Sequence, residues 1–398
     1  MSKQEDPDVD YDPFTFAMQE DPYDAYEALR DHCPVYHHPG RGFWALSRFE
    51  DVQEALRDWK TFSAAGGANL EDLEGIIPPG NFLDYDPPRH DELRSVVQPF
   101  FSPRRIAFLE DRIRWHAQEL IRGFGDRSRA DWAREFANPL PVRVISEMLG
   151  IPDEDQSSLK KWSDLIHYRE EGSDAVPQAG IDAADQMQVY FAELARQKRA
   201  HPQEDILSEI VVGSEGGPVP TDAEVGGMSF LLFIAGNSTT ANFIATSLLL
   251  LYRHPEQRLR LLEDKSLFND AIEELLRFES PVQNLAKTTT RDIELHDQVI
   301  PKGARVLMLY NSGGRDHREF DDPDRLNLGR PRKRHLAFGE GIHHCLGAPL
   351  ARLEARVGLE ELLDRFPDYE VTEPVEWFHS SNQRGIIGLP VEFTPLKS

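Results

Sequence analysis

The apolar run over residues 228–252, MSFLLFIAGNSTTANFIATSLLLLY, constrains the fold more than any other stretch, because it is long enough to cross a bilayer. Residues 236–240 at its centre are polar over consecutive positions. The sequence holds no second run of this kind against which they could be buried inside a membrane. We therefore expect a long helix buried within a folded protein, and not a membrane span.

The patterns on either side of this run predict a mainly helical chain with a minor sheet. Residues 88–265 have an almost wholly helical pattern, with Pro and Gly breaks near residues 103, 150–152 and 213–220. No repeat or composition break is visible, so we expect one domain over residues 1–398, mainly α with a minor β-sheet built from both chain ends. The other predicted elements are helices over 21–32 and 49–59, strands over 34–38, 42–48, 288–300 and 305–310, a helix after Cys345, and a closing hairpin over 384–396.

Charge excludes some classes of partner. The formal net charge is −25, from 69 acidic against 44 basic residues, and it repels phosphate backbones and anionic lipid. The first residues, MSKQEDPDVD, are acidic and lack an apolar core, so they predict neither a signal peptide nor an anchor. We expect a cytoplasmic protein that binds neither nucleic acid nor membrane.

Of the two cysteines, Cys33 and Cys345, only the second lies in a distinctive pattern. Residues 338–347 read FGEGIHHCLG and precede the helical pattern APLARLEARVGLEELL. A lone cysteine in a glycine-rich turn is more often a packing residue, but ten positions of suitable residue types favour a thiolate ligand of haem iron. Such a sulfur needs N–H donors and a helix N-terminus nearby. Glycines such as Gly339 would let backbone amides approach it, and Phe338 would cover it.

This loop resembles the ligand loop of the cytochrome P-450 monooxygenases, F-G-x-G-x-H-x-C-x-G, and the resemblance extends over nearly the whole chain. It implies the cytochrome P-450 fold, with a long central helix over haem b (iron protoporphyrin IX), and Cys345 as the axial ligand of the iron. Glu274 and Arg277 are similar to the family's E-x-x-R pair, a buried ion pair near the loop before the cysteine. In isolation, such a pair is more often a solvated surface pair.

The resemblance also implies the residues that hold the haem propionates. His90 and Arg94 match the family's H-x-x-x-R, and His343 is similar to the other propionate-binding histidine. Lys287 stands where relatives commonly place an arginine, and a lysine offers no bidentate contact, so we expect a looser one. Gly314 stands where asparagine is usual, and the sequence offers no functional account of it.

Residues 235–240, AGNSTT, resemble the family's oxygen-binding stretch, A-G-x-(D/E)-T-T. Glycine and hydroxyl side chains permit a local break in the helix that makes room for dioxygen. Thr239 matches the oxygen-contacting threonine, whereas Ser238 replaces the usual acid and can pass a proton only through its hydroxyl and water. The alternative is a tightly packed helix rich in Ser and Thr.

Two readings of the function follow within this family. Fungal nitric-oxide reductases also lack the acid and carry Ala-Gly-Asn, but they are thought to take hydride from a nicotinamide at a basic patch. Residues 64–80 here are acidic and should repel a nicotinamide nucleotide. We therefore favour a monooxygenase that inserts one oxygen atom from O2 into a small, largely apolar organic substrate, by hydroxylation or O-dealkylation. A non-catalytic haem-thiolate sensor or carrier would need the same loop, but neither Thr239 nor an apolar pocket.

The chain lacks a G-x-G-x-x-G motif and a cysteine cluster, so electrons should come from NAD(P)H through a separate ferredoxin reductase and ferredoxin. An acidic ferredoxin would dock on basic residues near the ligand loop. The candidates are Arg330, Arg332, Lys333, Arg334 and His335, with Arg104, Arg105 and Arg352 nearby. By resemblance, the substrate pocket comprises Leu231, Ile234, Ala235, Thr239, Val282, Leu285 and Ile386.

Overall fold

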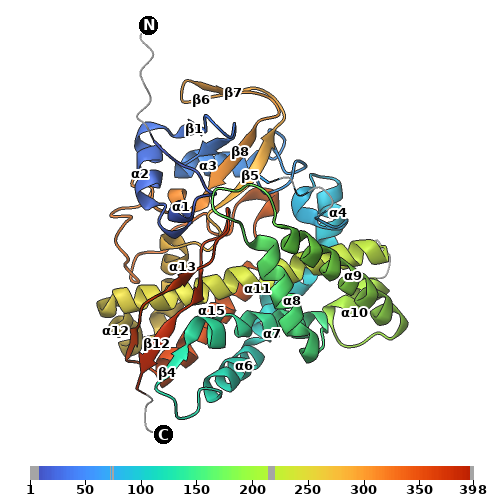
Figure 1. The fold of residues 1–398 in the computed structure, drawn as a ribbon, viewed down its shortest axis with the longest axis vertical. Coiled ribbons are helices and arrows are strands. Elements are labelled where there is room, and N and C mark those ends of the chain that lie inside the picture. The colour runs from blue at the N-terminus through green and yellow to red at the C-terminus, as the bar shows by residue number, and fades with distance from the viewer. Residues whose placement is uncertain (1–8, 72, 74–75, 214–219, 395–398) are drawn as a thin grey trace.

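The structure is a computed structural model that describes residues 9–71, 73, 76–213 and 220–394. Most of the chain is helical, as predicted, and Figure 1 shows most of the helices below a small sheet, with α2 and α3 beside its strands. The helices are α1 (Phe16–Glu20), α2 (Tyr23–His32), α3 (Phe49–Arg57), α4 (Arg89–Val97), α5 (Pro103–Ala107), α6 (Glu110–Arg122), α7 (Pro139–Leu149), α8 (Gln156–His167), α9 (Gln178–Ala200), α10 (Ile206–Val212), α11 (Asp222–Arg253), α12 (Pro255–Glu263), α13 (Phe268–Phe278), α14 (Tyr310–Gly314) and α15 (Ala348–Arg365).

The helix α11 crosses the middle of the molecule (Figure 1) and confirms the buried helix expected from the apolar run. It begins with a capping box formed by Thr221 and Glu224, and α7, α9 and α15 pack against it. It is long and apolar enough to span a bilayer, but 72% of its most apolar window is buried inside the protein. The predicted break at its centre is wrong, because the α-helix is continuous through residues 235–240.

The main sheet brings strands from the first residues together with strands that follow residue 281. Its order is β1-β2-β8-β5-β3, with β2 and β8 parallel and the other neighbours antiparallel. Two-stranded sheets pair β6 with β7 and β10 with β11, and a further sheet has the order β4-β12-β9. The strands are β1 (Val35–His37), β2 (Trp44–Leu46), β3 (Phe62–Ser63), β4 (Arg129–Asp131), β5 (Asn284–Thr289), β6 (Ile293–Leu295), β7 (Gln298–Ile300), β8 (Arg305–Leu309), β9 (Tyr369–Val371), β10 (Glu376–Trp377), β11 (Ile386–Gly388) and β12 (Pro390–Phe393).

The C-terminal strands do not form the predicted hairpin. Only Leu389 separates β11 from β12, and a hairpin needs a loop of about two residues to reverse the chain. Instead, β11 pairs with β10, and β12 pairs with β4 and β9. The end of the chain is therefore tied to two different sheets.

Candidate functional site

The cysteine loop lies between β8 and α15 and folds back on itself at Cys345. The Cys345 N–H donates to the Phe338 carbonyl at 2.8 Å, and Gly339 and Gly341 have φ angles of 65° and 68°. A Cβ on Gly341 would lie 2.5 Å from the carbonyl oxygen of Leu56. Both the left-handed backbone and the available space therefore require glycine at that position.

Burial dominates around the sulfur of Cys345 and raises the pKa of the thiol overall, but several neighbouring groups would stabilise its anion. Burial raises the pKa of the thiol, while the backbone N–H groups of Gly347 and Ala348 and the charges of Arg94 and Arg352 lower it. Ala348 begins α15, so the sulfur lies at a helix N-terminus. Cys345 remains accessible, although neighbouring residues desolvate its sulfur. These features suit a thiolate ligand of iron.

Phe338 packs against an arginine side chain, and position 347 has space for a side chain. The half-buried Phe338 ring lies beneath the Arg352 guanidinium, whose carbon is 4.3 Å from the ring centre. A Cβ on Gly347 would meet nothing within 4 Å. Contacts within the described chain therefore do not require glycine at position 347.

The predicted propionate-binding residues converge next to this loop. The rings of His90 and His343 are 4.4 Å apart between centres, and an Arg94 Nη2 donates to the His344 carbonyl at 2.7 Å. Burial lowers the pKa of His343 to about 2, with further lowering by the charges of Lys287, His90 and Arg94. Residues from α4, β5 and the cysteine loop thus form one polar cluster.

Two histidines of this cluster have unsatisfied ring nitrogens. His90 Nε2 and both ring nitrogens of His343 are buried without a hydrogen-bond partner in the described part of the chain. Buried polar atoms are rarely left unpaired, because desolvation without a hydrogen bond costs about 1–3 kcal/mol. Carboxylates of a haem would supply acceptors to these nitrogens and countercharges to Arg94 and Lys287. The residues present therefore fit haem b.

Sequence reasoning missed two acids beside the predicted propionate lysine. Burial lowers the pKa of Lys287 to about 8, while the charges of Asp86 and Asp84 raise it. Burial also raises the pKa of Asp84 to about 6, although the Ala68 N–H bonded to it acts in the opposite direction. The only sequence signal was the D-x-D spacing just before the His90 helix. The Lys287 charge is therefore shared between these acids and any haem carboxylate.

One stripe of the central helix is accessible although most of α11 is buried. Ala235 is exposed, and Leu231, Ile234 and Thr239 are partly exposed. Residues 231, 235 and 239 are four apart and hence lie on one helix face. The Thr239 hydroxyl donates to the Ala235 carbonyl at 2.9 Å. This face combines apolar surface with a single hydroxyl.

Ser238 does not share that face with Thr239. It is 2% exposed, and its Oγ lies 3.3 Å from Ser163 Oγ of α8 and 3.0 Å from Asn237 Oδ1. Asn237 Nδ2 in turn donates to the Phe233 carbonyl at 2.6 Å. Ser238 thus joins α11 to α8.

The other predicted pocket residues fall into two groups. Val282 and Leu285 are partly exposed and lie near the C-terminal region, where Val282 forms a β-bridge with Gln383. Ile386 is only 1% exposed and packs in the large hydrophobic core. The structure therefore gives Ile386 no accessible surface toward a ligand.

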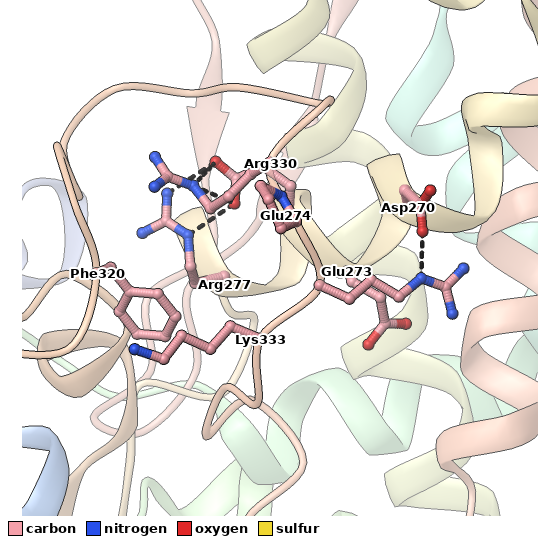
Figure 2. Close-up of a pocket in the computed structure, with 9 residues that line it drawn as sticks. Asp270, Glu273, Glu274, Arg277, Phe320, Arg330 and Lys333 are labelled. Atoms are coloured by element: carbon pink, nitrogen blue, oxygen red, sulfur yellow. Dashed lines mark hydrogen bonds and ion pairs between the residues drawn. The ribbon is translucent and has the colours of Figure 1, made fainter.

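Glu274 and Arg277 form the predicted buried ion pair, and Figure 2 shows both beside Arg330. Arg277 contacts the two Glu274 oxygens at 2.7 and 2.9 Å, and Arg330 Nε contacts both at 3.1 Å. An Arg277 Nη1 also donates to the Gly314 carbonyl at 2.6 Å, and a Cβ on Gly314 would lie 2.4 Å from the Arg277 carbonyl. This contact explains the glycine at position 314.

The basic residues before the cysteine are not free charges. The Arg330 side chain is only 14% exposed and forms an ion pair with Glu274. Arg330 therefore does not belong to the predicted docking surface. The other ion pairs are Arg332 with Asp270, Lys333 with Glu319, Arg334 with Glu340, His335 and Arg352 with Glu273, and Arg105 with Glu209. Arg332, Lys333 and Arg334 nevertheless remain exposed.

Residues 64–80 do not expose the acidic charge of Glu71 that the sequence analysis predicted. Asp72 and Glu74 lie outside the described residues. Glu71 is buried, and Arg169 Nε lies 2.7 Å from its Oε1. Because that charge is compensated inside the protein, Glu71 cannot repel a nicotinamide nucleotide at the surface.

Comparison with known proteins agrees with this geometry. The family model for cytochrome P-450 matches residues 142–376. A putative cytochrome P-450 123 of Mycobacterium tuberculosis is 37% identical over 391 residues, 97% of each chain, and the cytochrome P-450 monooxygenase PikC of Streptomyces venezuelae is 34% identical over 94% of this chain and 91% of its own. The crystal structure of CYP109E1 from Bacillus megaterium in complex with testosterone has a TM-score of 0.88 and 32% identity, covering 94% of this chain and 98% of its own.

The similarity extends along nearly the whole chain and includes the fold, and the cysteine loop and histidine cluster fit the cofactor of that family. The chain belongs to the cytochrome P-450 family and is a haem b oxidoreductase that incorporates oxygen from O2.

Proposed function

We propose that the enzyme inserts one oxygen atom into a small, largely apolar organic substrate by hydroxylation or O-dealkylation. The observation that carries this proposal is the accessible stripe of Leu231, Ala235 and Thr239 on the otherwise buried α11. In the cytochrome P-450 fold this helix lies over the haem, so the stripe would face the substrate. Apolar walls with few polar groups are typical of ligand pockets.

The chain's own residues would bind the haem and hold a proton near the substrate. Haem b supplies the activation of O2 when bound. Cys345 would hold the iron, and His90, Arg94, His343 and Lys287 the carboxylates. The Thr239 hydroxyl would hold a proton at the accessible stripe. The resemblance to a protein crystallised with testosterone supports apolar ring compounds as the first substrates to test.

We further propose that ferredoxin and ferredoxin reductase deliver electrons from NAD(P)H in the cytoplasm. The support is the exposed row of Arg332, Lys333 and Arg334 just before the cysteine loop. Their ion pairs are exposed, and such pairs contribute only about 0–1 kcal/mol. An acidic partner could therefore compete for these cations.

The test is a spectral screen of apolar ring compounds with the holoenzyme, followed by turnover with a ferredoxin system and isotopically labelled O2. A substrate should alter the ferric spectrum, and its product should carry one labelled oxygen atom. Ala235→Phe should weaken binding about tenfold or more by filling the stripe, while Ala200→Phe, at the exposed end of α9, should not. Equal effects of the two variants would refute the assignment of the stripe.

A nitric-oxide reductase is the second candidate, favoured by residues 235–237 and by the compensated charge of Glu71. It should consume nitric oxide with NADH alone. Rapid consumption without ferredoxin, together with no labelled product, would replace the first proposal.

A further inference from the structure

A groove lies where α6, α7 and the start of α10 meet. It encloses about 390 Å³, which is within the range of sites that hold small organic molecules. The described residues that line it belong neither to the cysteine loop nor to the histidine cluster nor to the accessible stripe. Its floor is apolar and includes Ile113, Val144, Met148 and Ile206. The groove therefore has both the room and the surface for an apolar ligand.

Helix α7 separates this groove from α11. Val144 and Met148 line the groove, whereas the neighbouring Ile145 packs against α11, where its Cγ1 would lie 3.1 Å from a Cβ on Gly236. Gly236 directly follows Ala235 of the accessible stripe. The groove is thus a separate site, one helix away from the proposed substrate face.

Two phenylalanines border the groove. The Arg105 guanidinium carbon lies 5.0 Å from the centre of the Phe100 ring, so one aromatic face already holds a cation. Phe108 is 77% exposed, the largest fraction among the exposed apolar side chains that the structure describes, and no cation of the described residues lies over its ring. The face of an aromatic ring attracts cations. Phe108 can therefore receive the cation of a ligand.

The charges of the lining leave one carboxylate without a counterion. Three of its four carboxylates have a basic partner, and the pairs are Arg112 with Glu147, Arg105 with Glu209 and Lys198 with Asp205. The fourth, Glu204, is exposed and its side chain has no ion-pair or hydrogen-bond partner in the described part of the chain. An uncompensated carboxylate beside apolar surface attracts cations and repels anions.

His116, which also lines the groove, adds no positive charge. Burial lowers the pKa of His116, although the hydrogen bond to Glu147 raises it, so the ring is neutral at pH 7. Nε2 lies 2.8 Å from Glu147 Oε2 and carries the hydrogen, because a carboxylate can only accept. Nδ1 is then an acceptor, and it is buried without a partner among the described residues. The groups of the lining that lack a partner thus call for a donor.

We propose that this groove binds an organic ammonium ion with an apolar body. The body would cover the floor, and the ammonium would lie near the Phe108 ring and the Glu204 carboxylate. Aromatic faces and carboxylates are the groups that attract such cations. The net charge of −25 also concentrates cations near the surface of the protein. This inference is independent of the substrate proposed above.

The experiment is isothermal titration calorimetry of the holoenzyme with benzyltrimethylammonium at low ionic strength. This ion has no lone pair with which to ligate iron. We expect one bound ion per chain, and a Kd about fivefold weaker in Glu204→Gln and in Phe108→Ala. Arg105→Gln should tighten binding about threefold, because it removes a competing cation and frees Glu209. Phenylmethanesulfonate, an anion of similar size, should not bind.

The matched control is a second exposed pair of an apolar and an acidic side chain, Leu259 and Glu263 of α12, which lies outside the groove. Leu259→Ala and Glu263→Gln should leave the Kd unchanged. Saturation of the haem with benzylimidazole should also leave it unchanged, and displacement of the ion would place it at the haem and overturn the proposal. The absence of saturable binding, unaltered binding in both Glu204→Gln and Phe108→Ala, or equal binding of the sulfonate would overturn it as well.

Discussion

The hydroxyl groups of Ser238 and Thr239, neighbours in the sequence, lie on different faces of α11. Thr239 donates to the Ala235 carbonyl on the accessible stripe, whereas Ser238 contacts Ser163 of α8 at 3.3 Å. A step of one residue turns a helix by about 100°. The two residues that sequence similarity groups as one catalytic pair therefore have separate environments, and they should respond differently to substitution.

Replacing Thr239 by alanine should divert oxygen to peroxide. The stripe would lose the hydroxyl that holds a proton there, and general acid assistance is worth about 10²-fold or more. We expect several times more hydrogen peroxide per NADH in a ferredoxin-driven assay, with ligand affinity unchanged. Thr240→Ala, in the buried neighbour, should leave the ratio unaltered. Equal peroxide yields from the two variants would contradict the role of Thr239.

Replacing Ser238 by aspartate should chiefly affect stability and pH dependence. The new carboxylate would be enclosed beside Asn237 Oδ1, a second acceptor, and such burial costs about 1–3 kcal/mol. Burial also raises the pKa of a carboxyl group, so the coupling of electrons to product should acquire a pH dependence. Ser238→Asn supplies the uncharged control. Denaturant unfolding and product yield at several pH values provide the measurements, and identical pH profiles for the two variants would refute this expectation.

Replacing Cys345 by alanine or histidine should abolish the strongly red-shifted absorption of the reduced carbon-monoxide complex, because only a thiolate ligand produces it. Cys33→Ala is the matched control, since Cys33 packs in a separate hydrophobic cluster with Tyr11 and Tyr26. That variant should keep the band. Survival of the band in Cys345→Ala would show that another residue holds the iron.

Haem retention should depend on the charge of Lys287. Burial lowers the pKa of Lys287 to about 8, and a haem carboxylate beside the ammonium would raise it. The complex then binds more protons than the haem-free protein, so haem affinity should fall as the pH rises above about 8. Lys287→Met should release haem to apomyoglobin about tenfold faster at pH 7.

Two further substitutions serve as controls for the measurement of haem release. Lys287→Arg should retain haem and lose the pH dependence, because an arginine stays charged. Lys302→Met, in an exposed lysine, should behave like the unmodified protein. Haem release that is independent of both pH and the residue at position 287 would exclude a contact with a carboxylate.

Charge reversal at Arg332 and Arg334 should slow electron transfer from a reduced acidic ferredoxin, most strongly at low ionic strength. Their ion pairs with Asp270 and Glu340 reduce the free positive charge, so we expect a change in rate and little change in fold. Arg122→Glu, in an exposed cation at the end of α6, is the control. If flash photolysis shows unaltered electron-transfer rates at low ionic strength, Arg332 and Arg334 do not form the ferredoxin-binding surface.

Local patterns were sufficient to predict the elements with strong periodicity or fixed chemistry. The helix over residues 228–252, the helix after Cys345 and the strand near 305–310 all appear in the structure. Hydrophobic spacing and turn residues act over a few positions, so the sequence carries that information directly. The prediction of a C-terminal hairpin was wrong, because strand pairing depends on partners that can lie far along the chain.

The sequence by itself determined which residues carry the chemistry, above all Cys345 and its glycines, because those roles depend on residue type and on short spacings. Only the tertiary structure decided which partners neutralise the charges: Arg330 joins Glu274, and Glu71 joins Arg169 across 98 positions. It also turned Ser238 toward α8 and enclosed Ile386 in the core. Such choices depend on which surfaces meet when the helices pack, since an ion pair gains enough to form only where burial and geometry bring its partners together.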